Sequence, residues 1–436
     1  MKRLASTAAA IAGALLLAGC TLNLPGVVIA PTLRATATVA APEASATLPA
    51  SPRATPTTTQ PTPTATSTLQ PVGPSLERLG AGREIVVRSI RMLDSTKGWA
   101  IGAPARATDR ILLTKDGGTT WRDASPPEPQ QPGTRMLAVG AFSSEARAWV
   151  AYALENPGQV PQVALVWRTN DGGATWTASA PLDIDPLMGI YQPSHLIFAD
   201  SEHGWLLVHA GAGMNHDYIA IYRTTDGGAS WIKIVDPFLT NNVQSCYKTG
   251  IFFATPLDGW MTGDCGGVAA GVLFFRTTNG GETWDVVRLP PPPDALDLYE
   301  RSDVACGAHS INFPDAQHGR VAVTCRMYSE TPSRDVFYLY LSENGGRLWV
   351  PMAFPGEQAV FLTKDLGWAV GPTVRRTTDG GQTWSEMGKV AWQGQFSFVS
   401  DTLGWAVAHA QEELALVTTR DGGRDWVILK PKTVAP

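Results

Sequence analysis

A short motif that recurs seven times limits what this chain can fold into more than any other feature of the sequence. A second motif, centred on Gly-Trp, precedes each copy by about 15–30 residues, as in DSTKGWAIG, DSEHGWLLV and TPLDGWMTG. Self-similarity at a regular period is typical of repeat architectures, so we expect seven equivalent structural units. The copies of the first motif are TKDGGTTW (114–121), TNDGGATW (169–176), TTDGGASW (224–231), TTNGGETW (277–284), SENGGRLW (342–349), TTDGGQTW (377–384) and TRDGGRDW (419–426).

Short apolar runs alternate with turns around both motifs. In the third repeat SHLIFAD precedes Gly-Trp, WLLVHA and AIYRTT follow it, and WIKIV follows the Gly-Gly turn. Four short strands in each repeat of about 35–65 residues describe one blade of a β-propeller. The 43 Gly, the 33 Pro and the low charged fraction of 17% also favour short strands joined by turns. We therefore predict an all-β fold, a seven-bladed β-propeller of four-stranded antiparallel blades, over residues 80–436.

The polar residue at the centre of the Gly-Gly motif has a structural explanation. The two glycines adopt positive φ at no steric cost, and an Asp or Asn side chain accepts hydrogen bonds from nearby backbone N–H groups. Seven equivalent residues do not make seven active sites, so we predict a turn role, no metal, and burial of the Trp that ends the motif. The residues concerned are Asp116, Asp171, Asp226, Asn279, Asn344, Asp379 and Asp421.

The N-terminal residues have the pattern that is typical of a targeting segment. Lys2 and Arg3 precede an apolar run that is too short for a transmembrane helix and ends in Leu-Ala-Gly-Cys at Cys20. Residues 1–19 are therefore predicted to be a lipoprotein signal peptide, with Cys20 lipidated; an ordinary cleaved signal with a chance cysteine is the alternative. Residues 20–79 are rich in Pro, Thr and Ala and are predicted to be a disordered tether. The expected location is extracytoplasmic, anchored by lipid to a bacterial membrane surface.

The motifs resemble a known family. The Ser/Thr-x-Asp-x-Gly-x-Thr-Trp element resembles the Asp-box, or bacterial neuraminidase repeat. Its pairing with Gly-Trp is similar to the photosystem II stability and assembly factor family, over roughly residues 80–430. The resemblance implies a seven-bladed propeller that is not an enzyme and binds partner membrane proteins. The chain departs from the pattern at Ala148-Trp149, which lacks the Gly, and at Gly319-Arg320, which lacks the Trp.

Four cysteines follow Cys20, in two pairs with the same spacing of 19 residues. Each pair lies in an equivalent place around the first hairpin of a blade, where an antiparallel pairing brings the two residues opposite each other. In an exported protein this arrangement predicts the disulfides Cys246–Cys265 and Cys306–Cys325. A zinc site is the alternative, although the chain lacks the usual Cys-x-x-Cys spacing.

Loop lengths point to one face of the predicted propeller. The Gly-Trp and Gly-Gly turns share a face and are short, whereas the loops of the opposite face are long and vary, mostly in blades one to five. Binding residues usually lie on such variable loops. The segment 288–309 carries four consecutive prolines, and Tyr and Arg are enriched at interface hot spots. We therefore predict a partner-binding site on this face; the alternative is a solvent-exposed loop that binds nothing. The residues of the predicted site are Tyr299, Arg301, Arg326, Tyr328 and Arg334.

Two other functions are weighed against protein binding. The net charge of −5 argues against a nucleic-acid partner. Sialidases also carry Asp-boxes, but the Arg-Ile here, Arg110-Ile111, lacks the Pro that their signature requires. Carboxylate pairs such as Asp183/Asp185 and Asp294/Asp297 do not define a mechanism without their separation. We predict a protein-binding or assembly factor that is no enzyme and needs no cofactor; the alternative is a glycan-binding or glycan-cleaving, sialidase-like surface lipoprotein.

Overall fold

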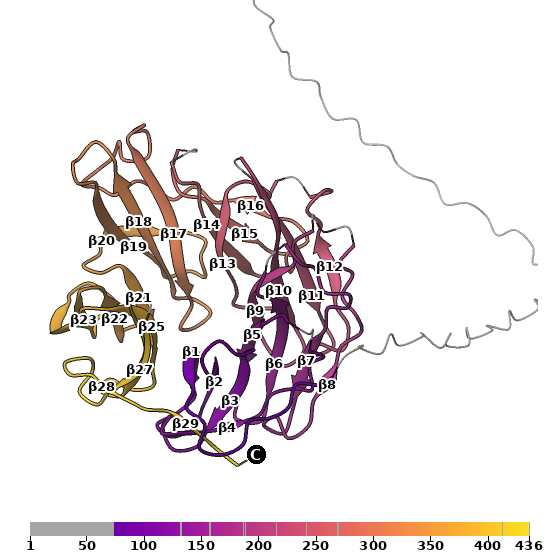
Figure 1. The fold of residues 1–436 in the computed structure, drawn as a ribbon. Coiled ribbons are helices and arrows are strands. Elements are labelled where there is room, and N and C mark those ends of the chain that lie inside the picture. Colours follow the sequence, from indigo (N-terminus) through magenta and orange to yellow (C-terminus); the bar gives the residue numbers. More distant parts are fainter. Residues whose placement is uncertain are drawn as a thin grey trace, which may run out of the picture. The chain divides into compact units, whose positions relative to one another are not determined.

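Strands make up the regular structure of this chain, and they follow one another in seven groups of four (Figure 1). The computed structural model describes residues 74–435 except 131–132, 157, 186, 188, 215, 241, 268–269 and 412. The predicted signal peptide, Cys20 and the tether up to residue 73 lie outside these described residues. Within the described part of the chain no helix is long and apolar enough to cross a membrane.

Blades 1 to 4 are antiparallel sheets in which consecutive strands are neighbours. Their strands are β1 (Val86–Met92), β2 (Gly98–Ala103), β3 (Arg110–Thr114) and β4 (Thr120–Asp123); β5 (Met136–Phe142), β6 (Ala148–Leu154), β7 (Val166–Thr169) and β8 (Thr177–Ala178); β9 (Gln192–Phe198), β10 (Gly204–Gly213), β11 (His216–Thr224) and β12 (Ile232–Val235); and β13 (Tyr247–Phe253), β14 (Gly259–Asp264), β15 (Phe274–Thr277) and β16 (Asp285–Val286).

Blades 5 to 7 repeat this order, and the predicted all-β propeller class is confirmed. Blades 4 and 5 are also joined into one larger sheet, because Asp264 on β14 pairs with Gly307 on β17. The strands are β17 (Val304–Asn312), β18 (Gly319–Met327), β19 (Arg334–Ser342) and β20 (Val350–Ala353); β21 (Gln358–Phe361), β22 (Gly367–Val370), β23 (Thr373–Thr377) and β24 (Ser385–Lys389); and β25 (Gln393–Phe398), β26 (Gly404–Ala410), β27 (Glu413–Thr419) and β28 (Val427–Ile428).

The first strand of each blade faces the centre of the ring (Figure 1). Residues of β1, β5, β9, β13 and β25 together line one cavity of about 330 Å³. Each blade packs on the next, and β1 contacts three strands of blade 7, namely β25, β26 and β27. Gln395 and Ser397 strengthen this last seam, since their side chains accept hydrogen bonds from the backbone N–H groups of Ile90 (2.9 Å) and Met92 (3.0 Å).

The ring is also closed by a strand that the sequence did not predict. We expected packing of blade 1 on blade 7, with at most a short extra strand from the segment before residue 83. Instead β29 (Lys432–Val434), from the C-terminus, pairs in parallel with β4 at the outer edge of blade 1. Thr433 ties this strand to the N-terminal side, because its hydroxyl accepts a hydrogen bond from the N–H of Arg83 (3.0 Å). Both ends of the propeller chain therefore meet on blade 1.

The folded part begins on the N-terminal side of the predicted boundary at residue 80. Ser75 forms a β-bridge with Pro129, and Leu76 is buried in the core between blades 1 and 2. The N–H of Leu79 donates to the carboxylate of Asp123 (2.8 Å). The last residues of the predicted tether are thus part of the propeller, because they bury apolar surface against blade 1.

The Gly-Gly turns share one hydrogen-bond pattern in all seven blades. In blade 3 the Thr224 hydroxyl donates to Asp226 (2.8 Å) and accepts from the N–H of Gly228 (2.9 Å), while Asp226 accepts from the N–H of Ser230 (3.0 Å). Burial opposes ionisation of Asp226, but hydrogen bonds from Ser230 and Thr224 outweigh it and lower its pKa to about 2. Gly227 and Gly228 both have positive φ, at 69° and 85°.

The Trp residues that end these motifs are not equally buried. Trp121, Trp231, Trp284 and Trp349 are at most 8% exposed, in line with the expectation. The other three copies, Trp176, Trp384 and Trp426, are more exposed than these four but still partly buried.

In blades 2, 3, 6 and 7 the Trp at the start of the second strand donates a hydrogen bond to the Asp-box of the next blade. Trp205 stacks on Phe253 of the next inner strand (3.6 Å between ring centroids), and its indole N–H donates to the carbonyl of Gly280 (2.8 Å). Trp405 of blade 7 donates in the same way to Gly117 of blade 1 (2.9 Å), so the same contact is made where the ring closes. The same bond is made from Trp149 to Gly227 and from Trp368 to Gly422.

Blade 5, which lacks this Trp, fills the joint with a buried arginine. Arg320 is 2% exposed, and its guanidinium lies 5.3 Å from the ring of Phe361 in blade 6. It also donates to the carbonyl of Lys364 (3.0 Å). A planar cation can replace an indole here because it covers an aromatic ring and still supplies an N–H donor.

Candidate functional site

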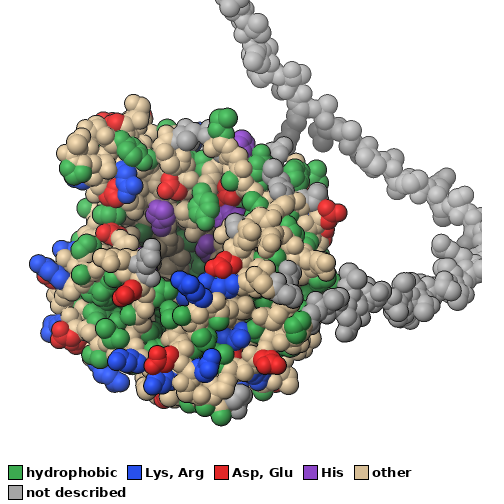
Figure 2. Space-filling model, viewed as in Figure 1, with side chains coloured by type: hydrophobic (Ala, Val, Ile, Leu, Met, Phe, Trp, Pro, Cys, Tyr) green, Lys and Arg blue, Asp and Glu red, His purple; other side chains and the backbone are tan. Residues whose placement is uncertain are grey.

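The face opposite the Asp-box turns carries the loops between second and third strands and the connections between blades. We call it the variable face. Figure 2 shows a hollow in the middle of the propeller with histidine side chains at its edge. Two histidines of the inner strands, His195 on β9 and His309 on β17, lie at blades 3 and 5. The candidate site is built on this face, from the loops that the sequence singled out.

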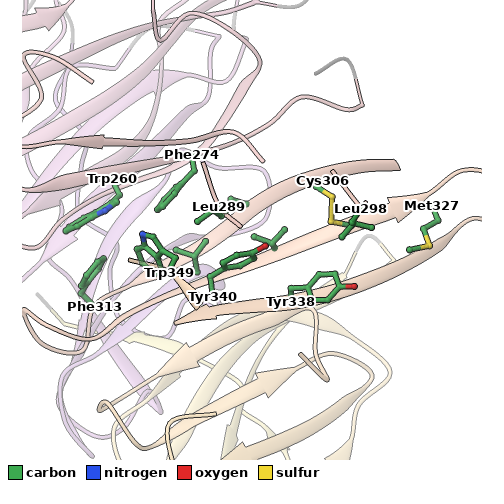
Figure 3. Close-up of a cluster of buried hydrophobic side chains, with 14 residues drawn as sticks. Trp260, Phe274, Leu289, Leu298, Cys306, Phe313, Met327, Tyr338, Tyr340 and Trp349 are labelled. Carbon is green, nitrogen blue, oxygen red and sulfur yellow. A yellow bond between two sulfur atoms is a disulfide. The ribbon is translucent and has the colours of Figure 1, made fainter. Parts of the chain in front are cut away.

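The proline-rich loop of residues 288–303 is fastened to the core by its own side chains. Leu289 and Leu298 are 6% and 1% exposed and lie in the cluster between blades 4 and 5 (Figure 3). The hydroxyl of Tyr340 on β19 donates to the carbonyl of Pro290 (2.7 Å). The loop therefore has apolar and polar anchors on either side of its exposed stretch.

Tyr299, one of the five predicted binding residues, points into the protein. Its hydroxyl bonds to that of Tyr340, and its ring packs on the cluster between blades 4 and 5. Burial raises the pKa of Tyr299 to about 12. The loop uses the ring of Tyr299 together with Leu298 as an anchor, and Tyr299 keeps some exposed surface, so its contact with a partner stays a prediction.

The three predicted arginines are each paired with an acidic residue of the same loops. Arg301 bonds to Asp303 at 2.7 Å. Arg326 bonds to Asp335 through two nitrogens, at 2.7 and 2.8 Å. In the third pair Arg334 bonds to Glu330 at 2.9 Å. The three arginine side chains are at least one-third exposed, and because each is paired, they form a surface whose positive charges are already neutralised.

The loops of residues 301–303 and 326–335 do come together. The N–H of Tyr328 donates to the carbonyl of Asp303 (2.8 Å), next to the pairing of β17 with β18. Tyr328 is 55% exposed and Leu296, on the proline-rich loop, is 70% exposed. Asp294, Asp297 and Glu300 are exposed on the same loop. We call the surface of Leu296, Tyr328 and the three ion pairs the blade-5 rim.

Both predicted disulfides are present at blades 4 and 5. Cys246 and Cys265 flank β13 and β14 at their variable-face ends. Cys306 and Cys325 lie opposite each other on β17 and β18. The bridges hold the bases of the loops that form and adjoin the blade-5 rim.

Sequence reasoning missed a buried polar cluster between blades 3 and 4. The Nδ1 atom of His209 lies 2.8 Å from Asp217, whose carboxylate also accepts from the N–H of Lys248 (2.8 Å). The half-exposed ring of Tyr247 stacks on His209, with 4.8 Å between centroids. Burial and the proximity of His209 lower the pKa of His195 to about 4. These residues lie on four different strands, and no sequence spacing connects them.

The carboxylate pairs raised by the sequence lie on exposed loops. Asp183 is paired with Lys233 at 3.1 Å and its side chain is 68% exposed. Asp294 and Asp297 are exposed on the proline-rich loop. Nowhere in the described ranges do three or more His, Cys, Asp or Glu side chains group in a way that could hold a metal ion.

Comparisons with known proteins support the fold. No protein-family model and no curated protein matches the sequence. Among solved structures the chain is similar to oligogalacturonate lyase in complex with manganese, with a TM-score of 0.52 and 8% identity, covering 80% of this chain and 97% of that one. A likeness at this identity concerns the fold alone, and it agrees with the propeller architecture.

The chain is also similar to two structures of YCF48, a photosystem II assembly factor. YCF48 bound to D1 peptide is 17% identical, with a TM-score of 0.47, and the match covers 80% of this chain and 99% of that one. YCF48 from Cyanidioschyzon merolae is 16% identical, with a TM-score of 0.46 and coverage of 80% and 98%. YCF48 is thus among the proteins to which this chain is similar, as the motif resemblance predicted.

Proposed function

We propose that this protein is a lipid-anchored, extracytoplasmic propeller that binds a protein partner through the blade-5 rim and catalyses no reaction. The observation that carries the proposal is an anchored loop that leaves apolar side chains in water. Leu298 and Tyr299 hold the loop on the core, while Leu296 and Tyr328 remain exposed. A loop ordered before binding loses less entropy when a partner docks, and exposed aromatic and apolar residues are the usual anchors of interfaces.

The proposed location rests on the N-terminal motif and the disulfides. Lipidation at Cys20 would hold the protein at a membrane surface through the tether. Disulfides persist mainly in oxidising compartments outside the cytoplasm, so the two bridges at blades 4 and 5 fit export. The partner would then be a protein reachable from that membrane surface.

The proposal is tested by crosslinking and pulldown of the native protein from membranes. Leu296→Asp and Tyr328→Ala should abolish recovery of the partner while the protein still folds. Leu348→Asp is the matched control, because Leu348 is 62% exposed on the same blade beside the Asp-box turn. Equal recovery with all three variants would contradict the rim as the binding surface. Deletion of residues 291–300 is unsuitable, since it also removes Leu298 and Tyr299 from the core.

Glycan binding is the second candidate function, and one observation favours it. The ring of Tyr247 lies flat on His209 and is 57% exposed, which offers an aromatic platform between blades 3 and 4. A panel of neutral and acidic oligosaccharides tests this function, with Tyr247→Ala as the variant. Binding that Tyr247→Ala removes and Tyr328→Ala does not would favour the glycan over the protein partner.

A further inference from the structure

A cavity on the variable face lies between blades 1 and 2, away from the blade-5 rim. It is a hollow that is open to solvent, with a volume of about 730 Å³, within the range of pockets that take small molecules. Its walls come from the β2–β3 loop, from the connection between β4 and β5, and from the residue that follows β6. The lining residues are Arg106, Thr108, Gln130, Gly133, Thr134, Arg135 and Glu155.

Positive charge is in excess around this cavity. Arg135 is paired with Glu155 at 2.8 Å, and Arg88, on the inner strand beside it, is paired with the buried Asp109. Arg106 is exposed and makes no ion pair with any residue that the structure describes. Among the lining residues, Arg106 and Arg135 supply two guanidinium groups and Glu155 supplies one carboxylate, which leaves one positive charge for a ligand. The Arg88–Asp109 pair is not part of the lining and is neutral as a pair. Burial and the charge of Arg135 lower the pKa of Arg88 to about 10, as expected where positive charges crowd.

Hydrogen-bond donors in this region are also left over. Within the described part of the chain, the amide nitrogen of Gln130 and the Nε of Arg135 are buried without an acceptor. The hydroxyl of Thr108 accepts from the N–H of Met136 (3.2 Å), so its own hydrogen remains to be donated. A buried donor without a partner is unfavourable, and an oxygen-rich ligand would remove that cost.

The lining is polar apart from the stems of the arginines. Thr108, Gln130 and Thr134 supply hydroxyl and amide groups, and Gly133 has open space around its Cα. A ligand that fits these walls carries hydroxyl groups as well as a charge. The blade-5 rim differs, because all of its arginines are paired with carboxylates, whereas Arg106 of the cavity makes no ion pair with a described residue.

We propose that this cavity binds a small hydroxylated monocarboxylic acid, with the carboxylate held by Arg135 and Arg106 and the hydroxyl groups by Thr108, Gln130 and Thr134. The single surplus charge accounts for one carboxylate. Guanidinium groups bind carboxylates with two parallel hydrogen bonds, which gives the site its preference for this anion. The site is independent of the proposed protein-binding function, and either can fail without the other.

The test is calorimetric titration of the full chain in low-salt buffer with three probes: gluconate, glucose and hexanoate. Gluconate carries both the charge and the hydroxyl groups, glucose lacks the charge, and hexanoate lacks the hydroxyl groups. Saturable binding of gluconate is expected, at least about tenfold tighter than that of either analogue, because each loses a set of polar contacts. Absence of saturable gluconate binding, or hexanoate binding as tightly as gluconate, overturns the proposal.

Variants connect the binding to the cavity. Arg106→Gln and Arg135→Gln are each expected to weaken gluconate binding about tenfold, since a charge-assisted hydrogen bond is worth about 1.5–3 kcal/mol. Arg106 is exposed, so its substitution leaves the fold unchanged and keeps the test valid if Arg135→Gln unfolds. Arg334→Gln, on the blade-5 rim, is the control and should leave the affinity unchanged. Equal weakening by Arg334→Gln would show a general charge effect and reject the site, as would full affinity in Arg106→Gln.

Discussion

The two faces of this propeller use their polar groups in opposite ways. On the Asp-box face, all seven turns have the same internal hydrogen bonds, and several Gly-Trp motifs donate to the next turn. On the variable face the loops differ, and some side chains there lack partners within the described chain, such as the amide of Gln130. Repetition therefore marks the face that holds the ring together. Unpaired donors alone do not mark the other face, because buried indole N–H groups of the Asp-box motifs, such as those of Trp231 and Trp284, also lack acceptors within the described chain.

Blade 5 sharpens this contrast, since it breaks the repeat on both faces. On the Asp-box face Arg320 replaces Trp but keeps the aromatic contact and the donated hydrogen bond. On the variable face the same blade adds a proline-rich loop with exposed Leu296 and Tyr328. The contact between blades 5 and 6 thus accepts Arg in place of Trp because Arg320 still covers an aromatic ring and donates a hydrogen bond. The proline-rich loop makes no such repeated contact and is free to differ from the other blades.

The largest expected effect on stability comes from removing a Trp that packs neighbouring blades together. Trp205→Ala should lower the free energy of unfolding by about 3–5 kcal/mol, because it leaves a large cavity and removes both the stacking on Phe253 and the indole donor to Gly280. Trp231→Ala, at the end of an Asp-box, should cost about 3 kcal/mol, since Trp231 is also buried. Chemical denaturation measures both. An unchanged midpoint for Trp205→Ala would show that the repeated face does not hold the ring.

The next largest effect on stability is expected from the disulfides at the base of the variable face. Replacing Cys306 and Cys325 together by Ala should cost about 3 kcal/mol, because the bridge spans 19 residues and restricts the unfolded chain. The midpoint of thermal unfolding, with and without a reducing agent, measures the loss. The wild type under reduction should approach the variant. A variant as stable as the oxidised wild type would mean that the Cys306–Cys325 disulfide does not stabilise the fold.

A smaller effect is expected from a carboxyl group in the β4–β5 connection. Burial raises the pKa of Glu128 to about 7, although the indole N–H of Trp167 donates to it. Its protonated form therefore stabilises the fold below pH 4.5, and this stability is lost as the pH rises through 7. At pH 8, Glu128→Gln should raise the free energy of unfolding by about 1–3 kcal/mol.

Denaturation midpoints at pH 5 and pH 8 separate this effect from a general change in charge. Wild type and Glu128→Gln should differ mainly at pH 8. Glu300→Gln is the control, because Glu300 is exposed on the proline-rich loop. A constant difference between Glu128→Gln and wild type at both pH values would show that the carboxyl does not titrate as described.

The smallest effect on stability is expected at the blade-5 rim. Tyr328→Ala should change the free energy of unfolding by less than about 0.5 kcal/mol, because the ring is 55% exposed. Denaturation of Tyr328→Ala beside Trp205→Ala gives the comparison of the two faces in one experiment. A loss for Tyr328→Ala as large as that for Trp205→Ala would remove the distinction between a structural face and a free one.

Much of the fold could be predicted because its signals are local. The period of the two motifs predicts the number of blades, and positive φ at pairs such as Gly227 and Gly228 follows from the turn that they form. The disulfide pairs follow from equal spacing around two hairpins. The surroundings of the predicted site residues could not be predicted in this way, because a sequence does not tell whether Tyr299 bonds to Tyr340 or whether Arg326 already has a partner in Asp335.

By itself, the sequence determined the repeated half of this protein: four strands per blade, the Asp-box turns, and the hairpins that the disulfides close. These features depend on residues near one another along the chain, so they can be predicted from the sequence pattern alone. Only the tertiary structure decided the rest. It brought β29 to β4 across the whole ring, packed Arg320 on Phe361, and gathered Arg106, Arg135 and Glu155 from three separate segments around one cavity. Such groups meet because closing the ring brings distant blades together, and the resulting balance of charges and donors exists only in three dimensions.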